Sequence, residues 1–176
     1  MSILQKTMGC IDWINEWLGK ILYPLILLIS IVVFIEISMR YFFGKPTNWS
    51  FETTQFLFII CTFLAAGHIH LESGHIGVDI FYSRFSRRGK LFINIITFPF
   101  PLLFIGSMVY FGFQFAYDSL MKLESTGSVW DPIIFPIKFA LPLGALLLFL
   151  QVVVNFIRDI QDIGNLLSDE RNGVED

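Results

Sequence analysis

The sequence predicts an all-α integral membrane protein with four transmembrane helices and an amphipathic interfacial helix at its N-terminus. Of its 176 residues, 55% are hydrophobic and only 15% are charged, which is far from the balance of a soluble globular domain. Four segments also meet the requirement of ~20 mostly apolar residues for crossing a bilayer core. Turn-forming or charged residues separate these segments. We therefore expect a single membrane domain over residues 1–176.

The segment 2–17 is expected to form the interfacial helix. Leu4, Met8 and later apolar residues recur at helical spacing, while charged and amide residues lie mostly elsewhere on the helix. Trp13 and Trp17 lie beside this apolar stripe, and such a helix is typical of the membrane surface. The alternative is that this segment simply continues the first span.

The predicted spans cover residues 18–39, 53–71, 91–117 and 139–157. The third is long enough to tilt, and Pro99 and Pro101 are expected to bend it near its start. In the fourth, Pro142 lies near the start, where the missing backbone N–H is least costly. Residues 168–176 are typical of an acidic, solvated end.

The distribution of Lys and Arg predicts the orientation of the chain. Four spans place both termini on the same side as the loop at residues 72–90. That side carries eight cationic residues and the other side four, namely Lys6, Lys20, Arg84, Arg87, Arg88, Lys90, Arg158 and Arg171 against Arg40, Lys45, Lys122 and Lys138. The positive-inside rule then predicts cytoplasmic termini. We expect no cleavable signal peptide, because the first strongly apolar run follows Trp17 and no small-residue cleavage pattern comes after it.

The stretch from Glu36 to Glu52 is predicted to form a tight hairpin between the first two spans. Glu36 and Arg40 lie four residues apart, so on a helix they share a face and can form an ion pair. Because an unpaired charge at membrane depth costs at least ~2.5 kcal/mol, we expect either an ordinary interfacial pair or a contact with another subunit. Residues 44–48 would make the turn. Trp49 suits the aromatic belt at the membrane surface, and Glu52 would lie at the positive end of the next helix dipole.

Three histidines raise the question of a haem or metal site. His68, His70 and His75 lie close together in the sequence, and no other span offers a histidine. A bis-histidine haem would need a second subunit, and a metal site would need help from Glu72 or Asp79. We therefore expect no cofactor and no metal, but histidines that form hydrogen bonds at the end of the second span, with a local pair between His75 and Asp79.

The sequence also disfavours an enzyme or a transport core. It has no nucleophile motif, phosphate-binding loop or carboxylate pair suited to hydrolysis, and its net charge of −3 argues against a nucleic-acid partner. Cys10 and Cys61 lie far apart, which argues against a redox pair. Transport cores usually have internal repeats and polar groups at the midplane of the membrane, and we find neither. An accessory membrane subunit is the expected class.

Several short motifs then resemble a known family. They are Arg40-Tyr-Phe with Trp49 and Glu52, Ala65-Ala-Gly-His with His75-Ile-Gly-Val-Asp79, Trp130-Asp-Pro, Pro136-Ile-Lys138, Leu141-Pro-Leu-Gly144 and Arg158-Asp159. Each motif is short. In this order and spacing, over nearly the whole chain, they resemble the small membrane subunit of the tripartite ATP-independent periplasmic (TRAP) transporters.

The resemblance implies a three-part system of the bacterial inner membrane. A soluble periplasmic protein would capture an organic acid, and a large membrane subunit would carry it across with sodium. The small subunit would be a scaffold in contact with the large subunit, the binding protein and membrane lipid. It would assign structural or subunit-contact roles to Glu36, Arg40, Trp49, Glu52, His75, Asp79 and Gly144. The outward loop at residues 118–138, with Trp130, Asp131 and Lys138, would dock the binding protein. The sequence does not indicate the cargo.

Two other classes stay open on the sequence alone. A small four-helix redox or cytochrome subunit is suggested by the histidines and the size of the bundle, and a stand-alone channel or carrier is disfavoured by the missing midplane polarity. In lipid, helices associate through small residues. The candidate points of close approach are Ala65, Ala66, Gly67, Gly106 and Gly144.

Overall fold

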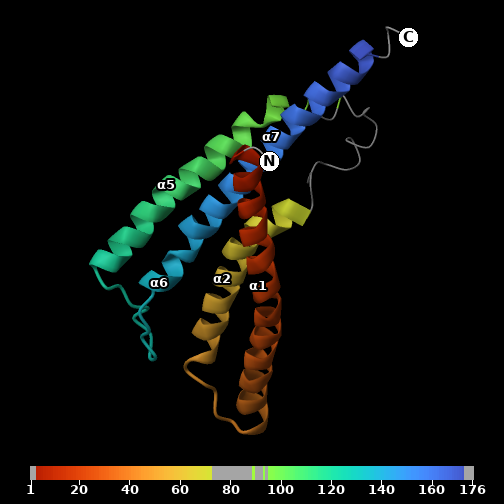
Figure 1. The fold of residues 1–176 in the computed structure, drawn as a ribbon. Coiled ribbons are helices and arrows are strands. Elements are labelled where there is room, and N and C mark those ends of the chain that lie inside the picture. Colours follow the sequence, from red (N-terminus) through yellow and green to blue (C-terminus); the bar gives the residue numbers. More distant parts are fainter. Residues whose placement is uncertain (1–2, 73–88, 90–92, 94, 173–176) are drawn as a thin grey trace.

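The computed structural model describes residues 3–72, 89, 93 and 95–172, which form helices and no strand (Figure 1). The helices are α1 (Ile3–Phe42), α2 (Ser50–Glu72), α5 (Pro99–Met121), α6 (Phe135–Lys138) and α7 (Ala140–Asn172). Within these described residues, four helical segments are long and apolar enough to cross a membrane, namely Leu4–Phe42, Ser50–Glu72, Ile95–Met121 and Phe135–Gly164. The predicted class, an all-α membrane protein with four spans, is confirmed.

Helix α1 runs without interruption across the boundary that we expected between residues 17 and 18. Its 40 residues correspond to a length of about 60 Å, twice the ~30 Å hydrocarbon core of a bilayer. Residues 3–17 are therefore continuous in one helix with the first span. That its first turns lie along the membrane surface stays a prediction.

The other helices agree with the predicted spans to within about a turn at most ends. Pro99 begins α5 directly after its N-cap residue Phe98, where a proline costs no helical hydrogen bond. Helix α7 continues well past the expected end at residue 157, as far as Asn172. The start of the acidic segment 168–176 is therefore helical, and residues 173–176 lie outside the described residues.

Helices α2 and α7 form the centre of the bundle. Helix α1 packs mainly on α2, and α5 packs on α7. Gly144 lies at the closest approach of α2 and α7, where a β-carbon would collide with the backbone carbonyl of Phe63. A small residue is required there, as is typical of helices that associate in lipid. Of the other small residues, Gly67 lies against the side chain of Asn15, whereas Gly106 has only an ordinary contact with Phe149.

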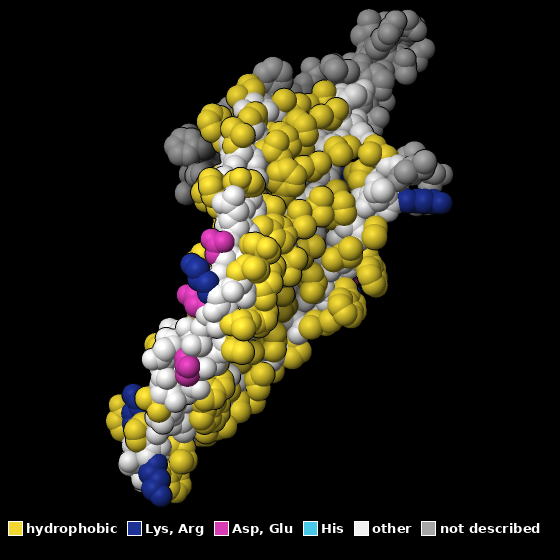
Figure 2. Space-filling view, turned by 90° about the vertical axis from the view of Figure 1, so that its left-hand side faces the viewer, with side chains coloured by type: hydrophobic (Ala, Val, Ile, Leu, Met, Phe, Trp, Pro, Cys, Tyr) yellow, Lys and Arg dark blue, Asp and Glu magenta, His cyan; other side chains and the backbone are white. Residues whose placement is uncertain are grey.

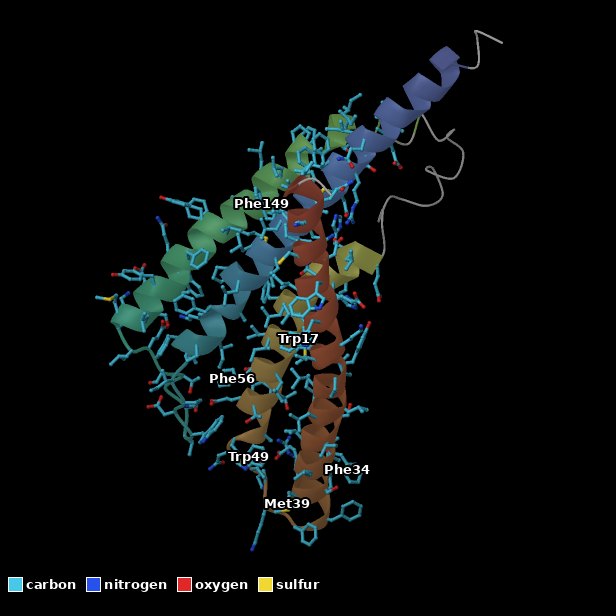
Figure 3. The ribbon with its side chains drawn as sticks, in the orientation of Figure 1. Trp17, Phe34, Met39, Trp49, Phe56 and Phe149 are labelled. Atoms are coloured by element: carbon cyan, nitrogen blue, oxygen red, sulfur yellow. The ribbon has the colours of Figure 1, made fainter. Side chains whose placement is uncertain are left out.

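Much of the hydrophobic surface is left uncovered by the chain itself. Only 11% of the most apolar window of α1, α2 and α5 is buried, against 39% for α7. Figure 2 shows hydrophobic side chains over most of one face of the molecule. Phe34 lies on the outer side of α1, away from α2 (Figure 3), and is 72% exposed. The bundle is thus built to be surrounded by lipid or by another apolar surface.

The helix ends and the connections between helices are divided between the two ends of the molecule. The start of α1 and the end of α7 lie at one end, while the turn between α1 and α2 and the loop between α5 and α6 lie toward the other (Figure 1). This arrangement agrees with four successive crossings of a membrane. The polar side chains of interest fall into three groups along this direction.

Candidate functional site

The first group is at the hairpin between α1 and α2, and it is organised around the carboxylate of Glu36. Its Oε1 accepts hydrogen bonds from Arg40 Nε at 3.1 Å and Nη2 at 2.7 Å. Its Oε2 accepts hydrogen bonds from the Thr47 backbone N–H at 3.1 Å, from the Thr47 hydroxyl, and from the Ser50 hydroxyl at 2.9 Å. One carboxylate thereby joins the end of α1, the turn and the start of α2.

The predicted pairing of Glu36 and Arg40 is therefore present within the chain. Both oxygens of Glu36 are occupied, and its side chain is only 13% exposed, so it has little capacity left for another subunit. Arg40 is 56% exposed. Among the described residues nothing bonds its second amino group, Nη1.

Trp49 and Glu52 lie at the start of α2. The Trp49 side chain is at the hairpin end of the helix (Figure 3), and its carbonyl accepts a hydrogen bond from the Thr53 backbone N–H at 3.0 Å. Glu52 accepts a hydrogen bond of 3.4 Å from the Thr126 hydroxyl. The hairpin thus contacts the loop between α5 and α6, which is the second group.

That loop is fixed to the bundle by Lys138. Its ammonium group pairs with Glu124 at 2.6 Å and lies over the Phe115 ring, 4.2 Å from the ring centroid. The hydrogen bond from Lys138 holds the pKa of the Glu124 carboxyl below its ordinary value. The Ile134 backbone N–H also donates to the Glu124 carbonyl at 2.9 Å. Both ends of the loop are therefore held together.

At the tip of the loop, Asp131 uses its carboxylate to stabilise a turn. It has a positive φ of 49°, and it accepts a hydrogen bond from the Gly127 backbone N–H at 2.8 Å. A hydrogen bond from the Ser125 hydroxyl and the one from Gly127 lower the pKa of Asp131. Next to it, Val129 and Trp130 are 84% and 45% exposed. The loop thus exposes two apolar side chains, while hydrogen bonds to Asp131 stabilise its turn.

The third group was missed by the sequence analysis and lies between α1 and α7. Asn15 and Gln151 are both fully buried, and Asn15 Nδ2 donates to Gln151 Oε1 at 2.7 Å. Gln151 Nε2 donates to Asp12 Oδ1 at 2.9 Å, and the other oxygen of Asp12 pairs with Arg158. We call Asp12, Asn15, Gln151 and Arg158 the amide network.

The expectation that the spans lack internal polar groups is wrong for Gln151. This residue lies two turns before Arg158, inside the apolar part of the fourth span. A sequence signal was present, because Gln151, Asn155 and Arg158 recur at the spacing that places them on one face of a helix. Their partners on α1 could not be identified from spacing alone.

His68 is buried where α2 meets α1, next to the amide network. A β-carbon at Gly19 would collide with its ring, and the Tyr23 hydroxyl lies 3.1 Å from its Nε2. The same nitrogen lies 3.3 Å from Glu72. Because the ring is enclosed on these sides, His68 has no room for a haem in this arrangement.

The remaining predicted residues have separate outcomes. His75 and Asp79 lie outside the described residues, and Gly144 lies at the contact of α2 with α7 described above. A search of the described residues finds no group of three His, Cys, Asp or Glu side chains that could hold a metal ion. The arrangement of the three polar groups is suited to joining helices.

The amide network generates a test of stability. We expect Gln151→Leu to lower the free energy of unfolding by about 1 to 3 kcal/mol, because Asn15 and Asp12 lose a buried partner. Chemical denaturation of the purified chain measures this. Gln55→Leu is the matched control, since Gln55 is exposed on α2 and should lose nothing. Asn15→Leu combined with Gln151→Leu should cost less than the sum of the single changes; simple additivity would contradict the network.

The pair of Glu124 and Lys138 generates a prediction about pH. Because the folded pKa of Glu124 is lowered, the pair stabilises the loop above the ordinary value of 4.5, and this stability is lost as the pH falls through the lowered folded pKa. Lys138→Met should raise the titration midpoint of Glu124, whereas Lys122→Met should change it much less. A carboxyl-labelled NMR titration measures both. An unchanged midpoint in Lys138→Met would exclude the pair as the cause.

Comparison with known proteins finds a family match and a relative. Residues 29–162 match the family model for the DctQ component of the tripartite ATP-independent periplasmic transporters. A chain of Haemophilus influenzae named a TRAP transporter small permease protein is 28% identical over 85 residues, which are 48% of this chain and 53% of the relative. The chain thus spans about half the length of that relative. Since the family model covers most of the four spans, the chain belongs to the DctQ family of small TRAP transporter subunits.

Proposed function

We propose that this chain is the small transmembrane subunit of a sodium-coupled tripartite transporter for organic acids, in which it holds the large transport subunit and helps to dock the periplasmic binding protein. The observation that carries the proposal is the separation of polar from apolar side chains. The polar groups between the helices bond to one another, and the outer surface is left apolar and largely uncovered by the chain itself.

The scaffold role is supported by the way the helices are held. The Glu36 carboxylate fixes α1 to α2 at one end, and the amide network fixes α1 to α7 toward the other. At Gly144, α7 lies directly against the backbone of α2 at Phe63. A bundle fixed in this way can act as a rigid body, which is what a stationary support for a moving partner needs.

The apolar faces of α1 and α5 are the proposed surfaces for the large subunit. Exposed large side chains on α5 include Phe100, Leu103 and Phe104. In lipid, such faces associate through van der Waals packing, without a hydrophobic driving force between helices. Transport of the substrate and sodium is assigned to the large subunit, because buried polar side chains of this bundle, such as Asn15 and Gln151, bond to each other across a helix contact.

The loop between α5 and α6 is the proposed docking element. Trp130 would contact the binding protein, since it is exposed beside Val129 and aromatic side chains contribute strongly at interfaces. Asp131 and Lys138 would stabilise the loop, because Asp131 accepts a hydrogen bond from Gly127 and Lys138 forms an ion pair with Glu124.

The proposed orientation puts both termini in the cytoplasm of a bacterium, with the chain in its inner membrane. The excess of Lys and Arg on the side of the termini supports it. Figure 1 agrees in placing the start of α1 and the end of α7 at one end of the molecule. The hairpin and the docking loop would then face the periplasm.

Uptake into liposomes tests the proposed function. Liposomes that hold the large subunit together with this chain should take up substrate from its binding protein, whereas the large subunit alone should not. With Trp130→Ala, the binding-protein concentration for half-maximal uptake should rise about tenfold, as for a hot-spot residue. Trp17→Ala is the matched control, because Trp17 is similarly exposed on α1. Equal curves for the wild type and Trp130→Ala would remove Trp130 from the docking site.

A further inference from the structure

An open groove lies between α1 and α2, next to the hairpin. It has a volume of about 340 Å³. The charged residues that line it are Arg40 and its partner Glu36. Val33, Ile37 and Phe51 contribute apolar walls. Nothing in the described part of the chain fills this space.

The groove changes from polar to apolar along its length. Arg40 lies in the last turn of α1, and Val33 lies two turns deeper. Trp49 and Lys45 mark the hairpin end as the part of the molecule that reaches the headgroups. Figure 2 shows Lys and Arg side chains among hydrophobic ones at this end. Val33 and Ile37 therefore lie farther from the hairpin than Arg40, whereas Phe51 lies next to Ser50 at the start of α2.

Arg40 is held in place but keeps binding capacity. Its Nε and Nη2 are bound to Glu36 Oε1, so the direction of the guanidinium is fixed. The two N–H groups of Nη1 have no partner among the described residues, and the side chain is 56% exposed. The other oxygen of Glu36 is occupied by Thr47 and Ser50. An anion arriving at the groove would meet a cationic edge.

We propose that this groove binds one anionic phospholipid from the leaflet on the hairpin side. The phosphate would bind to Nη1 of Arg40, since a guanidinium binds phosphate strongly through its planar array of donors. One acyl chain would lie along Val33, Ile37 and Phe51. A phospholipid fits because its charged headgroup lies beside apolar chains, as Arg40 in the last turn of α1 lies beside Ile37 and Val33 on the same helix. The lipid would lie in the groove between the two helices, next to the pair of Glu36 and Arg40.

Native mass spectrometry of the full chain from nanodiscs tests this site. With a mixture of phosphatidylglycerol and phosphatidylcholine, the wild type should retain one phosphatidylglycerol. Arg40→Gln should weaken retention about fivefold, as for loss of one cation at a membrane surface. Val33→Trp should also weaken it by filling the groove, while leaving the pair of Glu36 and Arg40 intact. Lys122→Gln is the matched control, because Lys122 is an exposed cation outside the groove.

Three results would overturn the proposal. The first is equal retention of phosphatidylglycerol by the wild type and Val33→Trp, and the second is equal retention of the two lipids by the wild type. The third comes from a photo-crosslinking residue placed at Ile37 in native membranes. We expect a lipid adduct; an adduct with the large transport subunit would show that a protein fills the groove. Circular dichroism checks that each variant remains folded. If Arg40→Gln does not fold, Val33→Trp still tests the groove.

Discussion

The structure depends on one constraint, which is that polar groups inside a membrane must find their partners within the protein. This chain meets the constraint with a few bonds between helices that are distant in the sequence. Asn15 reaches Gln151 across 136 positions of the chain, and Glu36 reaches Ser50 across the hairpin. Because either partner would be left unsatisfied if the helices separated, each bond fixes the relative position of two helices.

The same constraint explains why the molecule is apolar outside. The amide network uses its polar groups for contacts between helices, although the buried Asn15 Oδ1 and His68 Nδ1 have no partner among the described residues. Many large hydrophobic side chains, by contrast, face outward. Such a molecule is suited to holding other components in the membrane, in agreement with a small subunit of a multi-part transporter.

The spans were predictable because their hydropathy depends only on local composition. The pair of Glu36 and Arg40 was predictable for a similar reason, since both lie on one turn of a helix. The contacts of Glu36 with Thr47 and Ser50 were not, because they depend on the path of the turn. Gln151 and Asn15 required knowledge of which helices are neighbours, although the polar face of α7 was visible in the sequence.

The sequence predicted an end for the interfacial helix that the structure does not have. An amphipathic pattern indicates which face of a helix is polar, but it does not indicate where the helix ends. Neither Gly19 nor Pro24 interrupts α1, because packing against α2 and α7 outweighs the weak helix propensity of these residues. For the loop between α5 and α6, the sequence identified Trp130, Asp131 and Lys138 as candidates but did not distinguish their contacts. Only the geometry separates the exposed Trp130 from the two residues that hold the loop.

The most direct test of the account is affinity purification of this chain from its native membrane in mild detergent, followed by mass spectrometry of the proteins that elute with it. We expect a large multi-span membrane protein in roughly equal amount, because we propose that the uncovered faces of α1 and α5 contact the large subunit. Elution of the chain alone, or with redox subunits, would contradict the claim that it supports a transport subunit.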